Sequence, residues 1–156
     1  MTGAARTLRA GPETDWAEVA ALLRASFAYM EQRLGHPATA ALASPEALAR
    51  EARDGHCWVI REETLLACLF ARPSRDHAGA FYIGKLAVAE VARGQGLARR
   101  LIAEAEGEAR RQGFAALTLD TGAALTELHR AFGKLGFRLI TPAGPGSDVV
   151  TMWRDL

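Results

Sequence analysis

A strand, a glycine loop, a helix and a second strand follow one another in residues 80–121. Residues 80–90 (AFYIGKLAVAE) are rich in aromatic and branched side chains, which predicts a strand. From Leu97, apolar residues recur every three or four positions up to Gly113, which predicts a helix that ends at this glycine. Residues 115–121 (AALTLDT) predict a strand again. These elements form a βαβ unit, so its two strands are parallel and the fold class is α/β.

Strand and helix patterns also flank this unit on both sides. We expect a strand at 6–11, helices at 13–30 and 44–55, two antiparallel strands within 57–73, a helix from Thr121 to Leu135, and a final hairpin around residues 142–147. Together these elements predict a mixed, twisted sheet of about seven strands flanked by helices.

Length and charge limit the class of protein. The 156 residues suit a single domain over residues 1–156, since no linker or repeat divides them. The 19 Lys and Arg nearly balance the 18 Asp and Glu, which argues against nucleic acid or an acidic membrane as a partner. The chain has no apolar run long enough to cross a bilayer, and its first residues lack the apolar core of a signal peptide. A cytoplasmic protein is therefore expected.

The cysteines and histidines predict neither a disulfide nor a metal site. Cys57 and Cys68 fall on neighbouring predicted strands, and a reducing compartment would keep them as small hydrophobic residues. The four His and two Cys show no spacing typical of metal ligands, so we expect no metal.

The loop between the first strand and the helix of the βαβ unit has the composition of an anion site. The first N–H groups of a helix have no partner within the helix, and the helix dipole adds positive charge there. Gly94 and Gly96 remove the side chains that would keep a phosphate away, while Arg93 and Arg99 can donate charged hydrogen bonds. An ordinary glycine turn before a helix is the alternative.

Two well-known phosphate loops do not fit these residues. A P-loop needs Lys and Ser or Thr after its last glycine, but Leu97 and Ala98 follow Gly96. The dinucleotide fingerprint needs Gly or Ala where the chain has Arg99, and it stands near the start of its sheet.

The loop and a second motif resemble the GCN5-related N-acetyltransferase (GNAT) superfamily. The segment LAVAEVARGQGLA supplies Leu86, Val88, Arg93, Gly96 and Ala98 of the family's first motif. The segment RAFGKLGF, residues 130–137, supplies a helix that ends in Leu-Gly-Phe. The order of elements resembles the family over nearly the whole chain. This resemblance implies an acyl-CoA N-acyltransferase fold with a partly splayed sheet. It also implies an enzyme that transfers an acetyl group from acetyl-CoA to an amine.

The resemblance also implies how acetyl-CoA is bound. The pyrophosphate would rest on the loop and the start of the helix, made of Arg93, Gly94, Gln95, Gly96, Leu97, Ala98 and Arg99. Pantetheine would lie where two strands part, hydrogen-bonded to the backbone of the strand that carries Leu86 and Val88. An amide of this strand can also polarise the thioester carbonyl.

Catalytic side chains are less evident. Many family members carry a Tyr that protonates the leaving thiolate, but the matching residue is Phe132. Tyr82 is either a plain strand aromatic or part of the site, and Asp120 is either a helix N-cap or a general base. His129 belongs either to the helix surface or to the cleft. The missing Tyr keeps open a second hypothesis, an acyl-CoA sensor or regulatory domain without catalysis.

The family's acceptor pocket corresponds to the segment between the first two predicted helices. There Glu31 could attract a cationic amine and Arg33 a carboxylate, beside Tyr29 and His36, although a solvated loop is the alternative. The acceptor would be a primary amine of a small molecule or a peptide. A homodimer is a further expectation, because dimers are common in the family.

Overall fold

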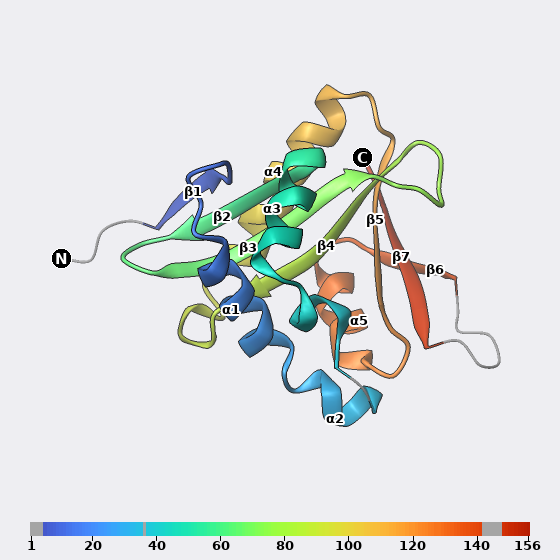
Figure 1. The fold of residues 1–156 in the computed structure, drawn as a ribbon. Helices are drawn as coiled ribbons and strands as arrows, with labels where there is room; N and C mark the ends of the chain where they lie inside the picture. Colours follow the sequence, from blue (N-terminus) through green and yellow to red (C-terminus); the bar gives the residue numbers. More distant parts are fainter. Residues whose placement is uncertain (1–4, 36, 142–147) are drawn as a thin grey trace.

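The computed structural model describes residues 5–35, 37–141 and 148–156, and within them seven strands form one open sheet (Figure 1). The strands are β1 (Arg6–Arg9), β2 (His56–Arg61), β3 (Leu65–Pro73), β4 (Ala80–Val88), β5 (Ala116–Gly122), β6 (Arg138–Thr141) and β7 (Val149–Asp155). Their order is β1-β2-β3-β4-β5-β7-β6, and every neighbouring pair is antiparallel except β4 and β5. The predicted mixed sheet of about seven strands is confirmed.

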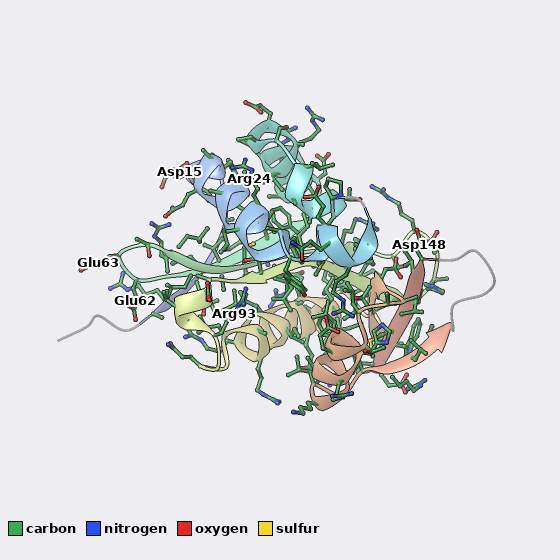
Figure 2. The ribbon with its side chains drawn as sticks, turned by 90° about the horizontal axis from the view of Figure 1, so that it is seen from below. Asp15, Arg24, Glu62, Glu63, Arg93 and Asp148 are labelled. Atoms are coloured by element: carbon green, nitrogen blue, oxygen red, sulfur yellow. The ribbon has the colours of Figure 1, made fainter. Side chains whose placement is uncertain are left out.

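Helices cover both faces of this sheet. They are α1 (Trp16–Phe27), α2 (Met30–Leu34), α3 (Pro45–Asp54), α4 (Leu97–Arg111) and α5 (Thr126–Lys134), with short 3-10 turns η1 (Thr39–Leu42) and η2 (Glu90–Ala92). Figure 2 shows the sheet edge-on, with α1, α2 and α3 on one side and α4 and α5 on the other. The helix N-caps follow the sequence: Asp15 accepts from the Glu18 N–H at 3.2 Å, and Ser44 accepts from the Ala47 N–H at 3.1 Å.

Each face of the sheet has its own hydrophobic core. On the α4 face, Phe81 and Leu117 pack with Leu101 and other α4 residues. On the α1 and α3 face, Val59 and Phe70 pack with α1, together with Cys57 and Cys68. Both cysteines are free, and they are fully buried where the sequence led us to expect half-buried residues, because they belong to strands in the middle of the sheet; burial raises the pKa of the Cys68 thiol to about 12.

The sheet opens between its two parallel strands. β4 and β5 pair only from Ala80 with Ala116 to Tyr82 with Thr118, and they part beyond Tyr82. On its other edge, β4 keeps its pairing with β3 but contains an irregularity opposite Leu69, where Lys85 adopts a φ of 50°. Such a bulge bends a strand, so β4 diverges from β5 at the point where the parallel pairing ends.

Two helix boundaries differ from the prediction. The last helix begins at Thr126 rather than Thr121, because β5 continues through Gly122 in pairing with β7. The predicted helix at 13–30 ends at Phe27, and a separate short helix, α2, follows it up to Gly35, whose φ is 79°. In the part of the chain described here, no helix combines the length and apolarity that a membrane span requires.

Candidate functional site

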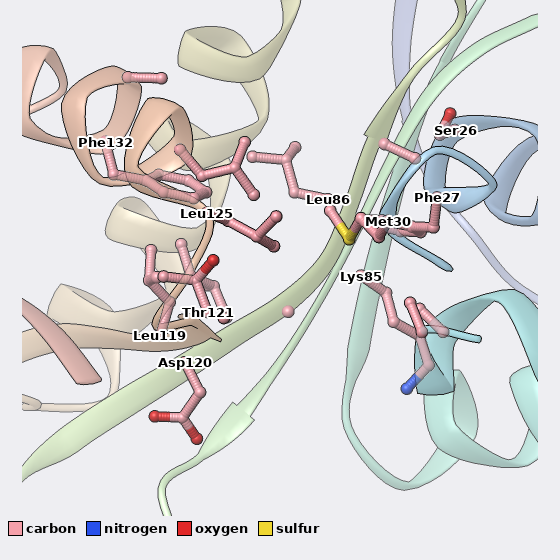
Figure 3. Close-up of a pocket in the computed structure, with 18 of the residues that line it drawn as sticks. Ser26, Phe27, Met30, Lys85, Leu86, Leu119, Asp120, Thr121, Leu125 and Phe132 are labelled. Atoms are coloured by element: carbon pink, nitrogen blue, oxygen red, sulfur yellow. The ribbon is translucent and has the colours of Figure 1, made fainter. Parts of the chain in front are cut away.

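The opening between β4 and β5 holds a cavity of about 920 Å³ (Figure 3). Its walls come from the parted strands, from the end of α1 and α2, from the loop before α4, and from α5. The cavity therefore lies where the predicted phosphate loop, the splayed strands and the predicted acceptor segment meet.

The loop before α4 is shaped to receive an anion. Gly94 and Gly96 have φ values of 79° and 77°, which favour glycine, and a Cβ added at either would meet no atom within 4 Å. Gly96 is the N-cap of α4 without a side-chain cap, and the first turn of α4 has no acidic residue. The N–H groups of Leu97, Ala98 and Arg99 are thus left for a ligand, since a helix provides no partner for them.

β4 turns unpaired backbone groups toward the cavity. The Ala89 N–H donates to the Leu66 carbonyl at 2.7 Å, so this residue faces β3. Because successive residues of a strand face opposite edges, the amides of Leu86 and Val88 face away from β3 and into the opening. Arg93 Nε donates to the Val88 carbonyl at 3.4 Å, in agreement with that direction. An extended ligand with amide groups can add to such an edge as a strand does.

The wall opposite this edge is apolar. It consists of residues from β5 and α5, namely Leu119, Leu125, Leu128, Ala131, Phe132 and Leu135. The Phe132 ring packs edge-on against Phe137, with 6.0 Å between the centroids. Phe132 therefore lines the cavity with a ring that has no proton to donate.

Tyr82 and Asp120 lie on the α1 and α3 side of the cavity. The Tyr82 ring covers Gly84 so closely that an added Cβ would come within 2.9 Å of its Cε1. Burial raises the pKa of Tyr82, and the nearby Asp120 carboxylate raises it further, so the hydroxyl stays protonated at neutral pH. Asp120 Oδ1 accepts from Thr151 Oγ1 at 2.8 Å, which orients the carboxylate. The predicted N-cap role of Asp120 is wrong, because Asp120 lies within β5 and Leu125 is the N-cap of α5.

His129 holds α5 to the end of β5. Its Nε2 is 2.9 Å from the Gly122 carbonyl, a bond that requires the proton on Nε2. His129 is not among the residues that line the described cavity.

α2, which carries predicted acceptor residues, lines one side of the cavity with Met30 and Leu34. Tyr29 lines it, and partial burial, followed by the Glu127 carboxylate, raises the pKa of Tyr29. Arg33 is engaged within the protein, because its guanidinium contacts the Glu127 carboxylate and donates to the Ala124 carbonyl at 2.6 Å. Glu31 is exposed and is not part of the cavity wall. The fourth predicted acceptor residue, His36, lies outside the described residues.

The structure adds site residues that the sequence patterns did not suggest. Arg72 lies over the Tyr82 ring, with 4.4 Å from its Cζ to the centroid, and Glu127 and Thr151 contact the candidate residues described above. The register of β3 with β4 places Arg72, the register of β5 with β7 places Thr151, and the approach of α2 to α5 places Glu127, so no local motif marks these residues. Across the described part of the chain, no group of three or more His, Cys, Asp or Glu is arranged to hold a metal ion.

Comparison with known proteins places this arrangement in context. The model of the acetyltransferase (GNAT) family matches residues 16–137. PaiA N-acetyltransferase from Thermoplasma acidophilum, solved in complex with coenzyme A, has a TM-score of 0.79 at 15% identity, over 99% of this chain and 100% of that chain. A GNAT acetyltransferase from Staphylococcus aureus Mu50 has a TM-score of 0.76 at 12% identity, over 98% and 99%.

A third structure, a GNAT acetyltransferase from Elizabethkingia anophelis with acetyl-CoA bound, has a TM-score of 0.68 at 16% identity, over 97% of this chain and 98% of that chain. No curated protein matches the sequence. At these identities the structural likeness establishes the fold, and the family is established by the sequence match over residues 16–137.

Proposed function

Because the chain belongs to the GNAT family of acetyltransferases, we propose that it transfers an acetyl group from acetyl-CoA to a primary amine of a small molecule or a peptide. The observation that carries this proposal is the continuity of the site. The glycine loop, the free amide edge of β4 and the apolar wall of α5 border one cavity of about 920 Å³.

The residues of this cavity fit the parts of acetyl-CoA. The amides of Leu97, Ala98 and Arg99 would hold the pyrophosphate, where the glycines leave open space. The backbone of Leu86 and Val88 would pair with the amides of pantetheine. Acetyl-CoA itself supplies the activated thioester carbonyl, and the Leu86 N–H would polarise this carbonyl by a hydrogen bond.

The acceptor side supplies a base but no evident acid. Asp120 keeps one carboxylate oxygen free of Thr151, so it can accept the proton that the acceptor ammonium must lose before its nitrogen forms the amide bond. The thiol that leaves when the C–S bond breaks has a pKa of about 8.5, by analogy with free cysteine, so it can depart without an acid from Phe132.

The amine attacks the thioester directly in this proposal, without an enzyme nucleophile. Cys57 and Cys68 are both buried on the α1 and α3 face, and burial raises the pKa of each thiol. A thiol that stays protonated is a poor nucleophile, and neither cysteine lines the cavity.

Acetyl-CoA turnover with a series of primary amines tests the proposal. We expect CoA binding, seen as a thermal shift, and release of free CoA that depends on the amine and yields the acetylated product by mass spectrometry. If the protein bound CoA but released no free CoA with any amine, the sensor hypothesis would be supported instead. The phenylalanine at position 132, which has no proton to donate, is the observation that favours this alternative. Absence of CoA binding would contradict both functions.

A further inference from the structure

A strip of polar side chains crosses three neighbouring strands on the face that α1 and α3 cover. Arg72 of β3 is in register with Tyr82 of β4, and Tyr82 with Thr118 of β5. Asp120 lies two positions after Thr118 and so faces the same side. In strand order Tyr82 lies between Arg72 and Asp120, and Asp120 stands where β5 has already parted from β4. The strip thus has a cation at one end and an anion at the other.

Arg72 provides most of its hydrogen-bond donors to the site. Its guanidinium lies over the Tyr82 ring, and among the described residues it donates one hydrogen bond, from Nη1 to the neighbouring Pro73 carbonyl at 3.3 Å. None of the ion pairs among the described residues includes Arg72. A guanidinium that lies over an aromatic ring still presents a planar fork of donors, which suits a carboxylate.

A small recess beside the main cavity carries net positive charge. It has a volume of about 100 Å³, is bordered by Arg72 and Glu51, and shares Tyr82, Gly84 and Lys85 with the main cavity. Lys85 Nζ lies 2.9 Å from Glu51 Oε1, so these two charges offset each other. The charge of Arg72 is therefore left for a ligand.

The opposite end of the strip is acidic. Asp120, Glu127 and Asp148 line the main cavity, and among the ion pairs between described residues Glu127 alone of these three has a cation partner, Arg33. Figure 3 shows Asp120 extending away from Leu125 and Phe132 of the apolar wall. An amine that approaches the thioester from this side meets Asp120 first.

We infer that the acceptor is zwitterionic: its amine faces Asp120, and a carboxylate a few bonds away is bound by Arg72 across the Tyr82 ring. Amino acids and short peptides belong to this class. The inference rests on the proposed acetyl transfer and names its acceptor. Arg33, which the sequence suggested for a carboxylate, is occupied by Glu127 and Ala124.

Pairs of acceptors that differ only in the carboxylate test this inference. We suggest β-alanine with β-alaninamide, and glycylglycine with glycylglycinamide, each assayed for CoA release with the wild type and with Arg72→Gln. The wild type should have the lower KM for the carboxylate member of at least one pair. Arg72→Gln should raise that KM about tenfold to a hundredfold, the effect of charged hydrogen bonds, and leave the KM of the amide within about twofold.

Two further variants separate recognition from structure. Arg72→Lys keeps the charge without the fork and should show an intermediate KM for the carboxylate acceptor. Arg24→Gln removes an exposed arginine of α1 and should leave every acceptor unchanged. Thermal unfolding and CoA affinity of Arg72→Gln should match the wild type, which excludes a general loss of structure.

Three results would overturn the inference. Equal KM values for carboxylate and amide acceptors in the wild type would show that no carboxylate is recognised. If Arg72→Gln raised the KM for the carboxylate and the amide acceptor by the same factor, Arg72 would only support Tyr82. If every amine failed to release CoA, acetyl transfer itself would be wrong, a failure distinct from transfer without carboxylate preference.

Discussion

At the scale of single residues, two glycines of α4 differ in whether their backbone conformation requires glycine. Gly96 has a φ of 77° at the N-cap of α4, whereas Gly107 lies within the helix with ordinary torsions, and neither would place a Cβ within 4 Å of another atom. We expect Gly96→Val to weaken CoA binding at least tenfold, because its side chain strains the turn and occupies the phosphate position. Isothermal titration with CoA measures this effect.

Gly107→Ala is the matched control for that measurement. It should leave the CoA affinity unchanged and raise the free energy of unfolding by about 0.5–1 kcal/mol, since alanine is the better helix former. If folded Gly96→Val bound CoA as tightly as Gly107→Ala, the loop would not be the phosphate site.

A hydroxyl at Phe132 would test whether protonation of the thiolate limits turnover. The ring points into the cavity beside Leu125 (Figure 3), so Phe132→Tyr adds a donor with little change in packing. We expect kcat to rise several-fold at neutral pH, with the KM for acetyl-CoA unchanged. An unchanged kcat would place the limiting step elsewhere, and Phe114→Tyr, on the far side of the core, serves as a control.

The predictability of the site differed from residue to residue. The loop at Gly94 and Gly96 could be predicted because a glycine turn between a strand and a helix has a local signature, and the structure gives both residues a positive φ; their contact with a phosphate stays a prediction. The partners of Arg33 could not be predicted, because Glu127 lies 94 positions away and only folding brings the two residues together. Arg72 gave no local signal, since its site depends on the register of β3 with β4.

At the scale of elements, a contact between α2 and the start of α5 closes the side of the cavity where we propose that the acceptor binds. Arg33 reaches from α2 to Glu127 and to the Ala124 carbonyl, and Leu34 approaches Gly122 at the end of β5. The sequence predicted neither α2 as a separate helix nor the late start of α5. Both boundaries are set by tertiary contacts, such as the pairing of β5 with β7, rather than by local propensity.

Arg33→Gln should loosen this contact without unfolding the protein. Exposed ion pairs contribute about 0.2–1 kcal/mol, so the unfolding temperature should fall by only a few degrees. We expect the KM for the acceptor to rise about three- to tenfold while the KM for acetyl-CoA stays constant, as steady-state kinetics can show. Arg130→Gln, an exposed change on α5, should alter neither KM. If Arg33→Gln had the same KM for the acceptor as the wild type, α2 would have no role in binding the acceptor.

Over the whole molecule, the sequence predicted the architecture better than the chemistry. The βαβ unit from Ala80 to Gly122 and the flanking antiparallel strands are present, and the family resemblance is confirmed. The spacing of apolar residues within one segment predicts which face of that helix or strand is buried, and no knowledge of the neighbouring elements is needed. The long-range polar contacts that complete the molecule depend on geometry that periodicity does not encode, and Glu108 is the clearest case.

Glu108 joins the sheet edge to α4. It is buried, with 10% of its side chain exposed, and its carboxylate accepts from Arg9 of β1 at 2.7 Å, from Gln112 at 2.7 Å, and from Arg111. The hydrogen bond from Gln112 lowers the pKa of Glu108 most, against an opposing effect of burial, and the arginines lower it further, from 4.5 to about 2. Since the folded state favours the charged carboxylate, this stabilisation is complete above pH 4.5 and is lost as the pH falls toward 2.

Glu108→Gln should therefore unfold more easily at neutral pH but not in acid. Charged hydrogen bonds to partly exposed arginines suggest a loss of about 1–2 kcal/mol in the free energy of unfolding at pH 7. Urea unfolding of wild type and variant between pH 7 and pH 2.5 should show this difference shrink below about pH 4.5, where the Glu108 carboxylate of the unfolded wild-type chain begins to gain its proton while that of the folded chain stays charged. His56 contacts Arg9 and Gln112 and is present in both proteins, so the difference between the two curves reports on Glu108. Glu104→Gln, an exposed change on α4, should follow the wild type at every pH, and a constant deficit of Glu108→Gln down to pH 2.5 would show that its charge is not what holds β1 to α4.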